Sequence, residues 1–102
     1  MAINNAALTT TASSIYTSTN NSAIVTIHLC NYSDSTQTVN VFIVPSGTIA
    51  NTTNMIYSNL QIAPTNTYII NSEKFILSDG DSIRANCNAA GTVSVTVSYI
   101  GI

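Results

Sequence analysis

Apolar residues alternate with serine, threonine and asparagine along much of this chain, a pattern typical of β-strands that bury one face. Residues 92–100 show it most clearly, because every second side chain is a valine or a tyrosine and those between carry hydroxyl groups. In residues 23–30 the alternation places Val25, Ile27 and Leu29 on one face. The pattern therefore predicts a strand in each stretch.

Residues 37–44 form a third predicted strand, with apolar side chains on both faces. One face carries Val39, Val41 and Ile43, and the other is enriched by Phe42 and Val44. Weaker alternation predicts further strands near residues 14–18, 55–62, 67–71 and 81–86. Clusters of Asn, Ser, Asp, Pro and Gly separate these segments, as expected of turns.

Seven or eight short strands at this spacing predict an all-β domain. We expect an antiparallel β-sandwich of jelly-roll or immunoglobulin-like type. Residues 1–13 are interpreted as an extended N-terminal arm, with an edge strand as the alternative for the Ser/Thr-rich part that begins at Leu8. Residues 14–102 then form a single sandwich domain, and no linker or second domain is indicated.

The composition is nearly free of charge. Charged residues make up 6% of the 102 residues, hydrophobic residues make up 45%, and the formal net charge is −2. The ionised side chains are Asp34, Glu73, Lys74, Asp79, Asp81 and Arg84. Because nucleic-acid affinity comes largely from Lys and Arg on phosphates, two cations do not predict a nucleic-acid-binding protein.

Strand faces rich in Ser and Thr lose less free energy on desolvation than charged faces would. They therefore favour a domain packed against copies of itself or a partner, and an ordinary solvated face is the alternative. The first residues contain neither a basic segment nor an apolar run of signal-peptide length, so we expect synthesis in the cytosol. No stretch approaches the length of a membrane-spanning helix, and no membrane association is expected.

His28 is the one histidine and thus the one candidate for an imidazole base. A Ser-His-Asp triad needs a carboxylate that orients the imidazole and a nucleophile in contact with it, and the sequence indicates neither. No Gly-x-Ser-x-Gly nucleophile elbow is present. We expect His28 to face outward or into an interface. The protein is predicted not to be an enzyme, with no catalytic, cofactor-binding or metal-binding residues and no cofactor.

Cys30 and Cys87 have a separation compatible with the bridge of immunoglobulin domains, but the accompanying tryptophan is missing. Alternation places Cys87 with Ile83 and Ala85, whereas Cys30 lies opposite the apolar face of its strand. Two separate reduced thiols are therefore predicted. A zinc site is less favoured, because two thiols and one imidazole fall short of four ligands.

Asp79-Gly80-Asp81 places two carboxylates around a glycine. Calcium takes six to eight oxygen ligands, so a tight turn with Gly80 at positive φ is favoured over a calcium site. Lys74 and Arg84 are expected to pair locally with Glu73, Asp79 and Asp81, which lie close to them in sequence. An anchoring role for Arg84 in a subunit contact is the alternative. Three sequons begin at Asn20, Asn31 and Asn51, and in this composition they are attributed to chance.

Three segments together resemble small β-sandwich virion proteins of tailed bacteriophages, including cyanophages. The first joins residues 15–18 to the strand 23–31, which ends in Cys-Asn, and the second is the strand 39–47, which ends in Val-Pro-Ser-Gly. The third joins residues 60–68, with a turn before Thr-Tyr, to residues 75–83, with the order Leu-x-x-Gly-Asp-x-Ile. The resemblance spans residues 14–100 and consists of strand ends and turns.

The resemblance implies a structural protein of the virion, present in many symmetric copies. The leading expectation is a capsid cement or decoration protein that docks on the major capsid protein, with a homotrimer favoured. A neck, tail or fibre component is the second hypothesis. A carbohydrate- or receptor-binding module is the third, and it would rely on the five tyrosines: Tyr16, Tyr32, Tyr57, Tyr68 and Tyr99.

Overall fold

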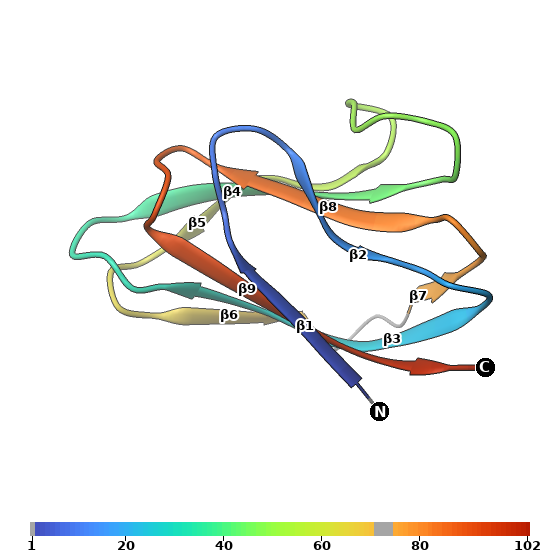
Figure 1. Cartoon of the computed structure of the whole chain (residues 1–102). Coiled ribbons are helices and arrows are strands. Elements are labelled where there is room, and N and C mark those ends of the chain that lie inside the picture. The colour runs from blue at the N-terminus through green and yellow to red at the C-terminus, as the bar shows by residue number, and fades with distance from the viewer. Residues whose placement is uncertain (1, 71–74) are drawn as a thin grey trace.

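A computed structural model describes residues 2–70 and 75–102, and these residues form two antiparallel sheets packed face to face (Figure 1). The prediction of an all-β antiparallel sandwich is confirmed. Nine strands lie within the described residues, and they are β1 (Ala2–Ala7), β2 (Ser13–Thr17), β3 (Ser22–Asn31), β4 (Gln37–Val44), β5 (Met55–Ile62), β6 (Thr67–Ile70), β7 (Phe75–Leu77), β8 (Ser82–Cys87) and β9 (Val93–Gly101). Seven of them correspond to the seven strands expected from alternation, and β1 and β7 are additional.

The strand order identifies the type of sandwich. Sheet A has the order β1-β9-β3-β6, with β7 also paired to β3, and sheet B has the order β2-β8-β4-β5. From β1 to β4 the chain crosses from one sheet to the other after every strand, and β8 and β9 continue this alternation. This is the order of a jelly roll, in which two Greek keys wind into two sheets. The immunoglobulin-like alternative does not fit it, because there the first two strands lie in one sheet.

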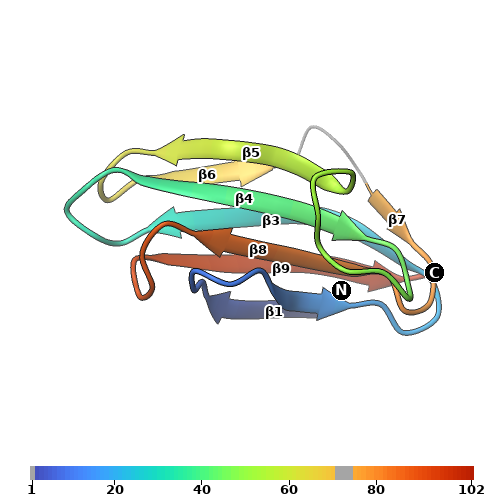
Figure 2. The same ribbon diagram turned by 90° about the horizontal axis from the view of Figure 1, so that it is seen from above.

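Edge strands of the two sheets lie along the margins of the sandwich. Figure 2 shows β1 along one margin of the molecule and β5 and β6 along the other. The segment expected as an arm thus contains β1, which pairs with β9 from Ala2↔Tyr99 to Ala7↔Ser94. Leu8, the next residue, is fully buried in the core between the sheets.

Alternation in β9 and β8 supplies much of the core. Val93, Val95 and Val97 are at most 1% exposed, as expected from the pattern. Ile83, Ala85 and Cys87 of β8 face them across the sandwich, and the residues between them are half-buried. Burying valine and isoleucine side chains contributes about 1.5–3 kcal/mol each, so these two strands account for a large share of the hydrophobic stabilisation.

A β-bulge in β3 corrects one expectation. The partner of Ile24 on β9 is Tyr99 and the partner of Thr26 is Ser98, so Val25 is the extra residue of the bulge. Because a bulge reverses the side-chain phase, Ile24 rather than Val25 joins Ile27 and Leu29 in the core. Val25 is half-buried.

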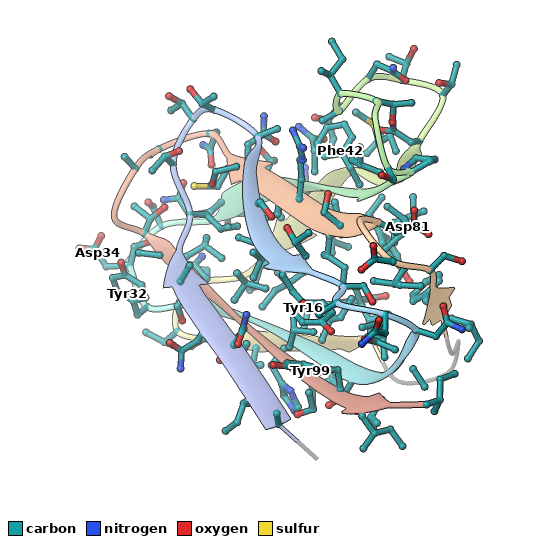
Figure 3. The ribbon with its side chains drawn as sticks, turned by 45° about the vertical axis from the view of Figure 1, so that its right-hand side comes forward. Tyr16, Tyr32, Asp34, Phe42, Asp81 and Tyr99 are labelled. Atoms are coloured by element: carbon teal, nitrogen blue, oxygen red, sulfur yellow. The ribbon has the colours of Figure 1, made fainter. Side chains whose placement is uncertain are left out.

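The two apolar faces of β4 are both buried, but in different places. Val39 and Val41 lie in the core, and Ile43 packs against it. Phe42 and Val44 point to the outer side of sheet B and are still only 5% and 1% exposed. Figure 3 shows Phe42 beside the segment 45–54 that leads from β4 to β5. Apolar residues on both faces of β4 therefore reflect a core on one side and a covering loop on the other.

Three hydroxyl groups form a buried polar cluster at the end of the sandwich where β2 leads into β3. The Tyr16 hydroxyl lies 2.6 Å from Ser22 Oγ, and Ser18 Oγ lies 2.9 Å from Ser22 Oγ. All three residues are at most 6% exposed. Each hydroxyl is thus satisfied by a neighbour, as burial of polar groups requires.

Candidate interaction surfaces

The outer side of sheet A is a broad surface to which all five strands contribute. Directly paired residues of antiparallel strands present their side chains on the same face, so the registers define its members. They are Ile3, Asn5 and Ala7 of β1; Ser94, Thr96, Ser98 and Ile100 of β9; Ala23, Thr26, His28 and Cys30 of β3; Thr67 and Ile69 of β6; and Ile76 of β7. We call this set the sheet A face. None of its members is buried.

The sheet A face carries hydroxyl, amide, thiol and apolar groups and the imidazole of His28, but no carboxylate, ammonium or guanidinium group. Four isoleucines lie toward its margins with much of their surface in solvent: Ile3 at 64%, Ile69 at 48%, Ile76 at 64% and Ile100 at 38%. Large apolar side chains gathered on one exposed face are characteristic of contact surfaces.

His28 lies in the middle of the sheet A face. It is paired with Thr96 on one side and Ile69 on the other, and it is half-buried. The expectation of an outward-facing histidine is therefore confirmed. Its nearest cross-strand neighbours offer an aliphatic side chain and a hydroxyl group, neither of which is a carboxylate that would orient an imidazole for catalysis.

The described ionised side chains lie away from the sheet A face. Figure 3 places Asp34 at one end of the sandwich and Asp81 at the other. Asp34 belongs to the β3–β4 loop, Asp79 and Asp81 to the β7–β8 turn, and Arg84 to the outer side of β8 in sheet B. The ionised side chains of the described residues thus lie in loops and on the outer side of sheet B.

The Asp79-Gly80-Asp81 segment is a turn, as favoured from the sequence, and Gly80 has φ +87°. The two carboxylates accept hydrogen bonds from backbone N–H groups. Asp79 Oδ1 accepts from Asn20 N at 2.8 Å, and Asp81 accepts from Ser46 N at 2.9 Å and from Ser78 N at 3.0 Å. The turn therefore ties the β2–β3 and β4–β5 loops together.

Arg84 is half-buried on the outer side of β8, where its paired neighbours are Phe42 on β4 and Ser14 on β2. Its Nε donates a hydrogen bond to Ser82 Oγ at 3.2 Å. Among residues 2–70 and 75–102 it forms no ion pair, so the expected local pairing is not seen with Asp79 or Asp81. The expected neighbours Glu73 and Lys74 lie outside the described residues.

Cys30 and Cys87 are both free thiols, as predicted. Cys30 belongs to the sheet A face, whereas Cys87 of β8 is 5% exposed and lies in the core between the two sheets. Cys87 Sγ contacts the carbonyl oxygen of Ala89 at 3.0 Å. The two sulfurs thus sit in different sheets, one outside and one inside.

One of the three sequon asparagines, Asn31, is buried. Asn31 is fully buried at the end of β3, and its Nδ2 donates to the carbonyl oxygens of Ser35 at 2.8 Å and Ile62 at 2.9 Å. Its Oδ1 accepts from Ser33 N at 3.0 Å and Ser33 Oγ at 2.7 Å. This side chain joins β3, the β3–β4 loop and the end of β5. Asn20 and Asn51 lie in exposed loops.

Four of the five tyrosines take part in ring contacts. Tyr16 stacks on Tyr99 between the two sheets, and Tyr57 meets Tyr68 edge-on with ring centroids 6.1 Å apart at the β5–β6 margin. Tyr32 is 51% exposed in the β3–β4 loop. The structure therefore does not bring the five rings together into one platform.

Within residues 2–70 and 75–102 there is no enclosed pocket and no group of three or more His, Cys, Asp or Glu side chains placed to hold a metal ion. The described residues also contain no helix long and apolar enough to cross a bilayer.

Comparisons with known protein families, with curated proteins and with solved structures found no match to this chain.

Sequence reasoning did not single out the exposed isoleucines. Ile3 and Ile76 lie in the two strands that were not predicted, and Ile69 and Ile100 lie near strand ends where alternation is weak. The registers of neighbouring strands reveal that these side chains share one face. Residues 2–7 show no alternation of apolar and polar side chains, so the sequence offered no signal that Ile3 lies on a strand.

Proposed function

We propose that this protein is a non-enzymatic structural component of a phage particle, with a cement or decoration protein of the capsid as its leading role. The observation that supports the proposal is the sheet A face, an exposed surface of five strands with isoleucines at its margins and no fixed charge. Such a face can be covered by another protein without burying an unpaired ion, whose desolvation costs several kcal/mol.

Two further considerations support this role. Jelly rolls recur in viral capsid proteins, although they also occur in lectins and cupins, so this is an argument by analogy. The segments that resemble phage virion proteins coincide with structural joints: Asn31 clamps the end of β3, and Gly80-Asp81 ties the β7–β8 turn to Ser46. These residues preserve the sandwich and its ends, which is what a protein that acts by shape requires.

In this role the sheet A face docks on the capsid surface and buries isoleucine and hydroxyl groups. Many weak contacts on one lattice add up to stable occupancy, because each bound copy is held among neighbours. The particle gains resistance to rupture from contacts that bridge adjacent capsid subunits.

The test compares purified particles with particles stripped of this protein. Quantitative mass spectrometry of washed particles should find it in a fixed ratio to the major capsid protein, and re-addition should restore occupancy. A ratio comparable to that of the capsid protein supports a place on the shell, and a much smaller fixed ratio supports the neck, tail or fibre. Particles that lack the protein altogether would refute the proposal.

A charge on the docking face sharpens the test. Thr96→Lys places an ammonium group beside His28 at the centre of the sheet A face, and Thr52→Lys places the same group in the exposed β4–β5 loop as a matched control. We expect Thr96→Lys to lower occupancy by on the order of 100-fold, because the face holds no carboxylate to pair with the ammonium group and burying an unpaired charge is strongly unfavourable. Thr52→Lys should bind like the unchanged protein.

A further inference from the structure

The free edge of β1 differs from every other sheet edge in the described residues. β1 is paired with β9 over six residues in unbroken register, and among the described residues no strand pairs with its other side. Natural sheets protect such edges with bulges, charges, prolines or very short strands. β1 has none of these, since its sequence is AINNAA.

The other edges carry recognisable protection. In sheet B, β2 has a bulge between Ser14 and Tyr16, and β5 has two register shifts opposite Val39–Phe42 of β4. In sheet A, β6 and β7 are only four and three residues long. Within the described part of the chain, protection is thus applied to every edge strand except β1.

Hydrogen bonding next to β1 shows which of its backbone groups face the open side. Leu8 N donates to Val93 O at 2.8 Å, in the same register that pairs β1 with β9. In an antiparallel pair, alternate residues direct their N–H and C=O groups to the partner strand. Ala2, Asn4 and Ala6 therefore face β9, and the N–H and C=O groups of Ile3, Asn5 and Ala7 are directed to the open edge.

We propose that this edge is a two-fold interface at which β1 of one copy pairs antiparallel with β1 of a second copy, joining their A sheets into one continuous sheet. An antiparallel copy of the same strand offers the complementary groups, as a two-fold contact requires. With Asn5 opposite Asn5 of the second copy, Ile3 lies opposite Ala7, and every outward N–H and C=O group of these three residues finds a partner. Directly paired side chains of the two copies then lie on the same face of the joined sheet.

The side chains suit this pairing. Ile3 is 64% exposed on the sheet A face and would be covered by the neighbouring strand. The remaining side chains of β1 are alanine and asparagine, which are small and uncharged and leave the backbone accessible.

A dimer formed in this way does not depend on the proposed place in a virion. It departs from the trimer that the resemblance implies, because two antiparallel β1 strands close on a two-fold axis. A strand of another virion protein is the rival occupant of the same edge, and it would leave the purified protein monomeric.

Sedimentation equilibrium of the purified protein over a range of concentrations tests the proposal. We expect the mass of a dimer for the unchanged protein and for Asn5→Ala, which keeps the outward N–H. Asn5→Pro removes that N–H and none of those directed at β9, and it should raise the dimer dissociation constant by on the order of 100-fold. Its melting temperature, measured where both proteins are monomeric, should match that of Asn5→Ala within a few degrees.

Asn5→Lys provides a second measurement that does not depend on proline. It keeps the N–H but opposes two ammonium groups across the two-fold axis, so the dimer should weaken at low salt and recover as salt screens the repulsion. A monomer or trimer for the unchanged protein, or a dimer unaffected by Asn5→Pro, would overturn the proposal. If the purified protein is strictly monomeric but still binds particles, the dimer proposal fails while the proposed function stands.

Discussion

The rings of Tyr16 and Tyr99 stack with their centroids 4.0 Å apart and their planes inclined by 28°, and they belong to different sheets. Tyr16 lies on β2 of sheet B and Tyr99 on β9 of sheet A, as Figure 3 shows. This contact joins the sheets at the end of the sandwich where the buried hydroxyl groups of Tyr16, Ser18 and Ser22 also meet. One aromatic pair thus combines an apolar contact between the layers with the anchoring of a polar cluster.

The first prediction concerns the energy of this stack. A double-mutant cycle with Tyr16→Leu and Tyr99→Leu should give a coupling energy of about 0.5–1.5 kcal/mol in urea unfolding, the range for aromatic pairs beyond their buried area. Tyr32→Leu is the control, because Tyr32 is 51% exposed and makes no ring contact within the described residues. A coupling energy near zero would show that the two rings stabilise the fold independently.

The second prediction concerns Gly80. A Cβ at this position would lie 2.5 Å from Ser46 Oγ, and the residue has φ +87°. Gly80→Ala should therefore lower the free energy of unfolding by about 2–4 kcal/mol, through backbone strain together with the clash.

Gly91→Ala separates the two contributions to that loss. Gly91 has φ +75°, but no atom lies within 4 Å of the position that an alanine Cβ would take, so this variant should lose only about 1 kcal/mol. Adding Ser46→Gly to Gly80→Ala should recover the part that comes from the clash. Equal losses for the two alanine variants in chemical denaturation would contradict the close approach of Gly80 to Ser46.

The third prediction concerns the buried amide of Asn31. Asn31→Leu leaves the carbonyl oxygen of Ile62 without its donor and removes the acceptor of Ser33, so unfolding free energy should fall by about 2–4 kcal/mol. Thr52→Ala changes an exposed residue of the β4–β5 loop and should cost within about 0.5 kcal/mol. Thermal unfolding of the two variants side by side measures the difference, and similar stabilities would argue against the clamp.

The fourth prediction concerns thiol reactivity. Cys30 lies on the sheet A face and should react with a thiol reagent in the native protein, whereas Cys87, 5% exposed, should react only after unfolding. Native labelling should therefore modify about one thiol per chain, and Cys30→Ser should abolish it. Rapid labelling of both thiols under native conditions would place Cys87 outside the core.

Much of the fold could be predicted because alternation records which strand faces are buried. Val93, Val95 and Val97 were assigned correctly, since β9 lies inside sheet A with one face on the core. The phase of Val25 was wrong because a one-residue bulge shifts the side-chain period and leaves no compositional mark. The strand character of β1 was missed because alanine and asparagine are weak strand formers. The strand is stabilised by its pairing with β9 instead, which the local sequence does not reveal.

The candidate surface was less predictable than the fold. Composition indicated that uncharged faces exist, but it did not show which residues lie together, because the sheet A face combines residues from both ends of the chain. Ile3 and Ser98 are neighbours on it only through the register of β1 with β9. Such neighbours become visible once the strand order is known.

The pairing of the chain's opening strands with its closing ones has a consequence for how the protein is made. β1 pairs with β9, β2 with β8, and β3 has β9 along most of its length. Domains dominated by such distant pairings fold in milliseconds to seconds, far more slowly than helical bundles. On the ribosome, one edge of β3 stays open until β6 and β7 have emerged, and the other edge stays open until β9 has emerged. In that interval neighbouring nascent chains compete for the open edge. Slower translation or a lower growth temperature should therefore raise the native yield.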